Sequence, residues 1–151
     1  GLVLISPNFR IANPAGVLLE WPYARHWVPL VLGRTRSFEP HNAGHAAHWT
    51  ISYPTEATVT MATLMRETRA RDLAQVEIPL LALFSDGDQV VSAAATREVL
   101  APWGGSLTLA AQDVPSEGAD PNQHVIAGDI LSPAMTQGIA SRITDWVADT
   151  L

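Results

Sequence analysis

The chain has 151 residues, of which 47% are hydrophobic and 16% are charged, and its formal net charge is −6. This composition is typical of a globular domain and excludes an intrinsically disordered chain. The negative charge argues against nucleic acid and anionic membranes as partners, and the absence of cysteine excludes disulfides and thiolate chemistry. No apolar stretch approaches the roughly 20 residues that span a bilayer, so we expect no stable membrane insertion. No signal-peptide pattern is visible, and the default expectation is a cytoplasmic location.

A continuous apolar run, "GLVLISPNF", opens the chain and ends at Pro7 and Asn8. Such a run predicts a strand that is covered on both faces, as in a parallel sheet. Residues 10–75 differ, because tryptophans and tyrosines lie there among prolines, which predicts short helices and loops. The clearest helical piece is "PTEATVTMATLMRETRARDLAQV", for which Thr55 is the expected N-cap.

Strands and helices alternate through the rest of the chain. "IPLLALFSD" (78–86) predicts a second buried strand, and Ser92 is the expected N-cap of a helix over "AAATREVLAP". "SLTLAAQDV" (106–114) predicts a third strand, followed by a turn-rich loop that ends at His124. This alternation predicts an α/β fold with a parallel sheet and right-handed crossovers.

The last predicted element is a helix over "SPAMTQGIASRITDWVADTL". Ser132 and Pro133 form its expected start, as an N-cap followed by a proline in the first turn. Its expected apolar stripe consists of Ile139, Ile143, Trp146, Val147 and Leu151.

Polar side chains follow two of the predicted strands at their carboxyl ends, where the functional groups of open α/β sheets gather. Asp86 and Asp88 come after the second strand, and His124 ends the loop after the third. This aspartate–histidine combination suits nucleophilic acyl transfer. The histidine takes a proton from a serine, and the carboxylate holds the imidazole in the correct tautomer.

Two segments resemble the α/β-hydrolases, most closely the bacterial serine hydrolases of the esterase and monoacylglycerol-lipase type. "PLLALFSDGDQVVS" is similar to that family's strand, acid-bearing turn and helix start, and "NQHVIAGDILSP" is similar to its histidine segment. The resemblance covers essentially the whole chain. It implies Asp88 as the catalytic acid, because "DQVV" follows the family pattern, and His124 as the catalytic histidine. Asp86 then becomes a turn former or a helper to the acid.

The resemblance also implies a division of the chain and a missing part. Residues 1–9 and 76–151 would form the C-terminal part of the hydrolase core, and residues 10–75 a helical lid inserted into it. The G-x-S-x-G elbow of these enzymes is absent, since Ser6, Ser85 and Ser116 all lie in other contexts. The resemblance implies that the nucleophile and the oxyanion hole lie upstream of "GLVLISP".

We therefore expect a fragment of a larger hydrolase, inactive by itself, rather than a naturally short relative without a nucleophile. Such a half-sheet predicts self-association or pairing with the missing N-terminal half. A monodisperse monomer without a partner in light scattering would contradict that expectation.

The expected function is the cleavage of a small-molecule carboxylic ester with an apolar acyl or alcohol group, without a cofactor. One alternative is another chemistry of this fold, namely haloalkane dehalogenation, epoxide hydrolysis or C–C bond cleavage, and a second is a non-catalytic binding module. The identity of the residue at the nucleophile elbow would distinguish these alternatives from the esterase. A flavodoxin-like domain would need a phosphate loop after the first strand, of which "SPNFRIANP" gives little sign.

The aromatic insertion raises two further questions. His41, His45 and His48 have spacings that share one helix face, as metal ligands often do, but Pro40 and Gly44 interrupt them. No acidic or thiol ligand accompanies them, so we expect lid or loop residues and no metal site. The tryptophans and methionines of this segment either line an acyl pocket or form a small core of their own.

Overall fold

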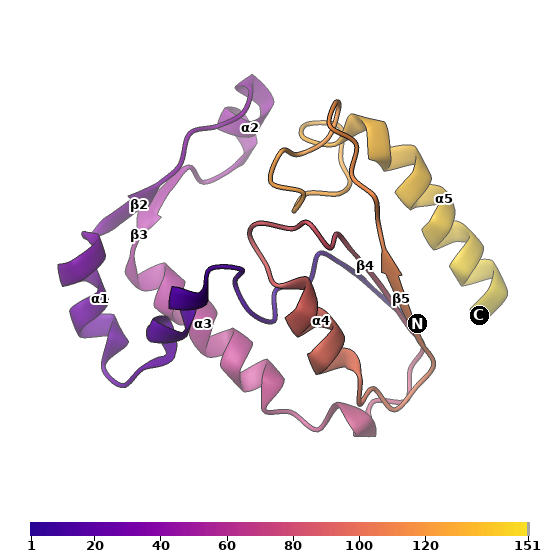
Figure 1. Cartoon of the computed structure of the whole chain (residues 1–151), viewed down its shortest axis with the longest axis horizontal. Helices are drawn as coiled ribbons and strands as arrows, with labels where there is room; N and C mark the ends of the chain where they lie inside the picture. Colours follow the sequence, from indigo (N-terminus) through magenta and orange to yellow (C-terminus); the bar gives the residue numbers. More distant parts are fainter. Residues whose placement is uncertain (151) are drawn as a thin grey trace.

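Three parallel strands form the central sheet, in the order β1-β4-β5 (Figure 1). They are β1 (Leu2–Ile5), β4 (Leu80–Phe84) and β5 (Leu107–Ala111) in a computed structural model that describes residues 1–150. The alternation of strands and helices in the sequence predicted this α/β arrangement, and the parallel pairing of both neighbours with β4 confirms it. All three carboxyl ends therefore lie at one edge of the sheet.

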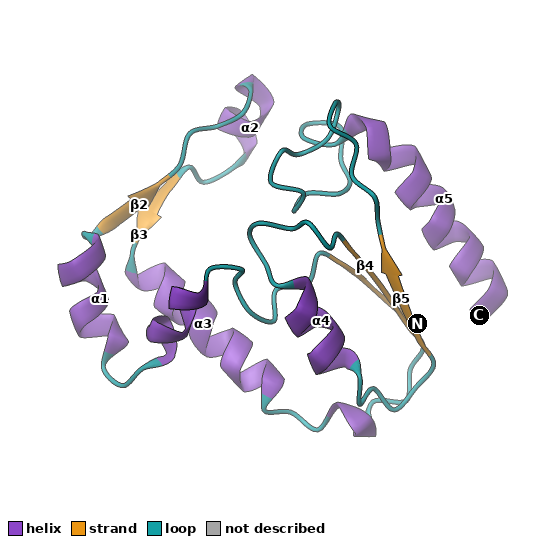
Figure 2. Ribbon diagram, in the orientation of Figure 1, coloured by secondary structure: helices purple, strands orange, loops and turns teal. Residues whose placement is uncertain are grey.

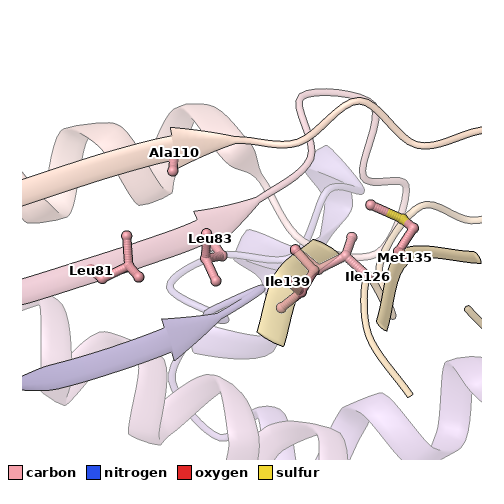
Figure 3. Close-up of a cluster of buried hydrophobic side chains, with 6 residues drawn as sticks. All are labelled: Leu81, Leu83, Ala110, Ile126, Met135 and Ile139. Carbon is pink, nitrogen blue, oxygen red and sulfur yellow. The ribbon is translucent and has the colours of Figure 1, made fainter. Parts of the chain in front are cut away.

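Two helices cover the two faces of the sheet (Figure 2). α4 (Ala93–Leu100) packs on one face and α5 (Pro133–Thr150) on the other. The alternation of side chains along β4 divides the core in the same way. The cluster under α5 contains Leu81, Leu83, Ala110, Ile126, Met135 and Ile139 (Figure 3). The cluster under α4 contains Phe9, Leu80, Ala82, Ala95 and Leu100.

Burial differs between the central strand and its neighbours. Every residue of β4 is at most 1% exposed, as expected for an apolar strand covered on both faces. β1 and β5 are edge strands in the described part of the chain, and Ile5 and Leu109 are 44% and 39% exposed. The prediction of two covered faces is therefore right for the second apolar run and wrong for the end of the first.

The insertion, defined here as residues 10–75, connects β1 to β4. As predicted, it consists mainly of short helices and loops, and α3 is its longest helix. Its helices are η1 (Pro14–Glu20), α1 (Ala24–Leu32), α2 (Ala43–His48), α3 (Glu56–Arg69) and η2 (Leu73–Gln75). The sequence did not predict the antiparallel pair β2 (Thr35–Ser37) and β3 (Ser52–Pro54). Strands of three residues are too short to show an alternating pattern.

Two of the three expected N-caps, Ser92 and Thr55, have different outcomes. Ser92 caps α4, since its side-chain oxygen accepts a hydrogen bond from the Ala95 N–H at 3.2 Å. Thr55 directly precedes α3, but its side chain makes no capping bond. Its hydroxyl is fully buried and donates to the Gly33 carbonyl at 2.6 Å, so it ties the start of α3 to the end of α1.

The last helix begins at Pro133, as predicted. Ile139 is buried, and Ile143 and Trp146 pack against the same core cluster, as the predicted stripe requires, whereas Val147 is 39% exposed. Leu151, the last predicted member of the stripe, lies outside the described residues. None of the described helices combines the length and the apolarity that crossing a bilayer requires.

Candidate functional site

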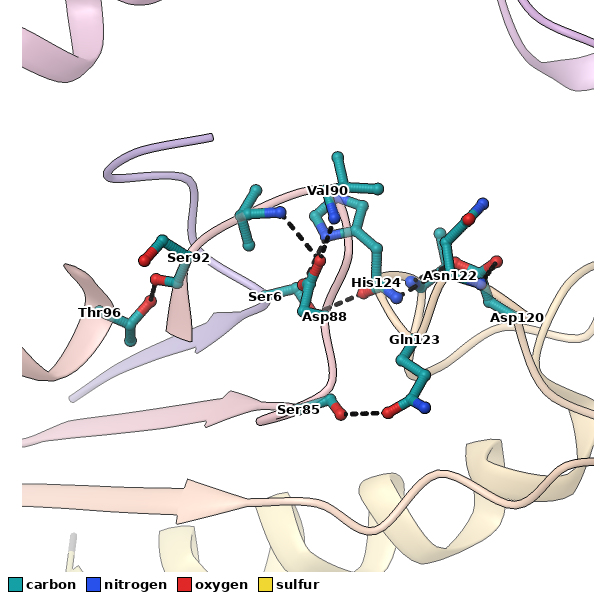
Figure 4. Close-up of polar contacts among 12 residues, drawn as sticks. Ser6, Ser85, Asp88, Val90, Ser92, Thr96, Asp120, Asn122, Gln123 and His124 are labelled. Atoms are coloured by element: carbon teal, nitrogen blue, oxygen red, sulfur yellow. Dashed lines mark hydrogen bonds and ion pairs between the residues drawn. The ribbon is translucent and has the colours of Figure 1, made fainter. Parts of the chain in front are cut away.

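The loops that follow β1, β4 and β5 meet at the carboxyl edge of the sheet (Figure 4). Ser6 follows β1, Asp88 follows β4, and His124 ends the long loop after β5. The structure brings the two residues that the sequence analysis singled out into direct contact. The Oδ2 atom of Asp88 lies 2.9 Å from Nδ1 of His124.

The conformation of the turn after β4 fixes the Asp88 carboxylate. The Ser85 hydroxyl accepts the Gly87 N–H at 3.1 Å, which closes the turn. The Oδ1 atom of Asp88 accepts the N–H groups of Val90 and Val91 at 2.8 and 2.9 Å. Only 1% of the Asp88 side chain is exposed. Oδ1 is therefore held by the backbone, and Oδ2 is directed at His124.

The His124 ring lies between a buried carboxylate and solvent. Its side chain is 28% exposed, and Nδ1 faces Asp88. Within residues 1–150, no hydrogen bond is recorded for Nε2, the other ring nitrogen. A carboxylate at Nδ1 favours a proton on that nitrogen and leaves Nε2 with a free lone pair. This arrangement can accept a proton at Nε2 and stabilise the resulting imidazolium.

Asp120 shapes the loop that carries His124, and the sequence analysis missed it. This residue is 3% exposed. Its carboxylate accepts three backbone N–H groups, from Asn122, His124 and Val125, at 3.0, 3.2 and 2.9 Å. An aspartate before Pro-Asn is a recognisable turn former, but its three acceptor contacts cannot be inferred from the sequence.

The Ser132 hydroxyl serves the same loop. It accepts the Asp120 N–H at 2.9 Å and donates to the Val125 carbonyl. Ser132 lies directly before α5, at the position where the sequence predicted an N-cap. The bonds described for its side chain go to the His124 loop and not to the first turn of the helix. The position of α5 and the conformation of that loop depend on each other through this hydroxyl.

Replacement of Asp120 by alanine is expected to destabilise the fold by about 2–4 kcal/mol, because it leaves three partly buried backbone N–H groups without their acceptor. Urea denaturation measures the change in the free energy of unfolding. Asp129→Ala is the matched control, since Asp129 is exposed and lies in the same loop. Equal stability of the two variants would contradict the role assigned to Asp120.

Asp88 and His124 are called the dyad below. A second set of contacts connects the two loops beside it. Gln123 has a left-handed backbone with φ of 55°, which places its side chain against the turn after β4. Its Oε1 atom accepts the Ser85 hydroxyl at 2.9 Å. A Cβ atom on Gly87 would lie 2.2 Å from the same oxygen, so any larger residue at this position would displace the end of the Gln123 side chain.

Asp86 has a different environment from Asp88. Its carboxylate accepts hydrogen bonds from Nη1 and Nη2 of Arg97, whose guanidinium group also lies over the Phe84 ring at 4.6 Å. The hydrogen bond from Arg97 holds the pKa of the Asp86 carboxyl below its usual range. The Asp86 side chain is 61% exposed, so it makes a surface ion pair with α4 and no recorded contact with His124.

None of the serine hydroxyls in the described part of the chain is bonded to Nε2 of His124. The closest candidate by position is Ser6, at the end of β1, whose backbone is left-handed with φ of 45°. Its hydroxyl donates to the His124 backbone carbonyl at 2.6 Å and therefore supports the loop rather than facing the ring nitrogen.

Of the three histidines that suggested a metal site, His41, His45 and His48, only two belong to an aromatic cluster. His45 is buried, stacks on His41 with centroids 5.5 Å apart, and meets Trp49 edge-on at 4.9 Å. His48 is exposed. Among residues 1–150, no group of three or more potential ligands could hold a metal ion.

Comparisons with known proteins give no assignment, since no family model matches the chain and no curated protein is significantly similar to it. The functional argument therefore rests on the geometry of the described residues.

Proposed function

We propose that this chain supplies the acid and the histidine of a serine hydrolase with the α/β-hydrolase fold, which cleaves carboxylic esters. One observation carries the proposal: a buried carboxylate bonds to Nδ1 of a histidine at the carboxyl edge of a parallel sheet, at 2.9 Å. The Nε2 atom of that histidine has no recorded partner in the described residues. This is the arrangement that a serine nucleophile needs for activation.

In the proposed reaction, a serine outside this sequence attacks the ester carbonyl while Nε2 of His124 takes its hydroxyl proton. Asp88 keeps Nδ1 protonated and stabilises the positive ring. The C–O bond to the alcohol then breaks, and His124 returns the proton to the leaving oxygen. Water hydrolyses the acyl-enzyme by the same proton transfers, which regenerate the serine.

The outer edge of β1 supports the proposal that further strands complete the sheet. Within the described residues β1 pairs with β4 alone, and Ile5 at its end is 44% exposed. An exposed apolar edge strand favours pairing with another strand. We propose that the strand preceding the nucleophile elbow pairs here, which would bring the serine to the same carboxyl edge as His124.

The insertion supports the assignment as a lid through its position and composition. It enters the fold directly after β1 and returns directly before β4. Its surface is unusually apolar, with Leu30 and Val31 of α1 exposed to 81% and 70%. Met61 of α3 contacts Asn8, just beyond the end of β1, so α3 borders the segment that leads out of the site. Exposed apolar side chains of this kind suit an apolar acyl group.

A fluorophosphonate probe tests the proposal, because it labels only an activated serine. The 151-residue chain alone is expected to remain unlabelled. The same chain combined with the polypeptide that carries the nucleophile elbow is expected to be labelled, and to release acid from an apolar p-nitrophenyl ester. Labelling of the isolated chain would contradict the assignment of the nucleophile. Absence of labelling and turnover in the combined protein would overturn the proposed function.

A further inference from the structure

Asn122 joins the two loops that carry the dyad. It lies two residues before His124, and its backbone carbonyl accepts the N–H of Gln89, the residue after Asp88, at 2.9 Å. Its own N–H bonds to the buried Asp120 carboxylate at 3.0 Å. A shift of Asn122 would therefore change the Asp88 turn and the His124 loop together.

The side chain of Asn122 is held from the insertion. Its Nδ2 atom donates to Nε2 of His41 at 3.3 Å, a contact between residues 81 positions apart in the chain. His41 is itself fixed by α2, since its ring stacks on His45 and its backbone N–H donates to Nδ1 of His45 at 3.2 Å. Because His45 is buried, it gives the exposed His41 ring a fixed packing partner.

A neighbouring contact anchors the same part of the insertion. Nδ2 of Asn42 donates to the Ile130 carbonyl at 2.7 Å, and Gly44 packs closely against the Ile130 side chain. We therefore expect α2 to stay docked on the 120–132 segment when the His41 contact alone is removed. This separation allows the His41–Asn122 bond to be tested without loss of the docking itself.

We propose that His41 is a positioning residue supplied by the insertion, which aligns His124 on Asp88 by holding the Asn122 side chain. The inference rests on the proposed function in so far as the dyad is catalytic. The insertion then has a second role besides covering the substrate. His124 is fully aligned with Asp88 only while α2 is docked on the His124 loop. His41 touches neither substrate nor the reacting atoms and acts through Asn122.

Two substitutions at His41 test the stacking of its ring and its role as a hydrogen-bond acceptor separately. His41→Phe keeps the stacking on His45 but removes the nitrogen that accepts from Asn122, whereas His41→Gln keeps an acceptor without the ring. In the protein combined with its nucleophile, His41→Phe is expected to lower kcat about three- to ten-fold with little change in KM, the effect of one lost hydrogen bond. His41→Gln is expected to restore most of the loss.

Asn122→Ala removes the other partner of the same bond. It is expected to reproduce the effect of His41→Phe, and the double variant should add little further loss. His48→Phe is the matched control, because His48 is an exposed histidine at the end of α2, seven positions from His41, which lies just before that helix. Equal kcat values for His41→Phe and His48→Phe, or full additivity in the double variant, would overturn the inference.

A spectroscopic measurement keeps this inference distinct from the proposed function. The proton on Nδ1 of His124, bonded to Asp88, should give a downfield imidazole resonance in proton NMR of the 151-residue chain. His41→Phe should speed its exchange with water, and His48→Phe should not. An unchanged exchange rate in His41→Phe sinks the positioning role alone. A resonance that persists in Asp88→Asn contradicts the dyad and, with it, the proposed function.

Discussion

Replacement of His124 by alanine is expected to lower kcat of the proposed hydrolase by about four orders of magnitude, because it would remove the proton acceptor and donor of both proposed chemical steps. Substrate binding should change much less, since in the proposed enzyme the substrate is held by the insertion and the acyl pocket and not by His124. The measurement is steady-state hydrolysis of an apolar p-nitrophenyl ester. Turnover within ten-fold of the parent enzyme would remove His124 from the mechanism.

The fold should survive this substitution at a moderate cost. The backbone N–H of His124 still bonds to Asp120, and the Asp88 carboxylate keeps the N–H groups of Val90 and Val91. Asp88 nevertheless loses a partner while remaining buried, which is expected to cost about 1–3 kcal/mol of stability. Thermal unfolding monitored by circular dichroism separates this cost from the loss of turnover.

His48→Ala is the control for His124→Ala. It removes an exposed imidazole from α2, and the described residues give that ring no hydrogen bond. It should leave both turnover and thermal stability close to those of the parent. A comparable loss of kcat in the two variants would mean that the assay does not report on the dyad.

The contact between Asp88 and His124 is the part of the site that the sequence predicted best. Carboxyl ends of parallel strands meet at one edge, so residues that follow two adjacent strands are brought together by the topology itself. The resemblance separated Asp88 from Asp86, and the two carboxylates do have different partners, His124 and Arg97. Their catalytic and structural roles remain predictions for the experiments proposed above.

Other contacts depended on tertiary packing that no local pattern encodes. Thr55 matched the preferences of an N-cap, yet its hydroxyl bonds to Gly33, because β2 and β3 bring the end of α1 against the start of α3. The link between His41 and Asn122 spans 81 positions and needs both the insertion and the His124 loop in place. Asp120 looked like an ordinary turn residue since its acceptor contacts form only in the folded loop.

Asp88→Asn is expected to lower kcat by about 10³- to 10⁴-fold while the fold stays intact. The amide oxygen can still accept the N–H groups of Val90 and Val91. The turn keeps its conformation only if the oxygen stays on that side. The NH₂ group of the amide then faces Nδ1 of His124 and donates where the carboxylate accepted. The imidazole must carry its proton on Nε2, the nitrogen directed at the nucleophile, and so cannot act as the base.

Asp86→Asn tests whether this effect belongs to one aspartate of the turn. The two residues are separated by Gly87 alone, but the exposed Asp86 pairs with Arg97. Loss of a solvent-screened surface pair is expected to cost at most about 1 kcal/mol in the free energy of unfolding, with turnover near that of the parent. A large loss of kcat in Asp86→Asn with normal turnover in Asp88→Asn would reverse the assignment of the acid. A large loss in Asp88→Asn alone would link catalysis to the tautomer of His124, because both substitutions remove one negative charge from the same turn.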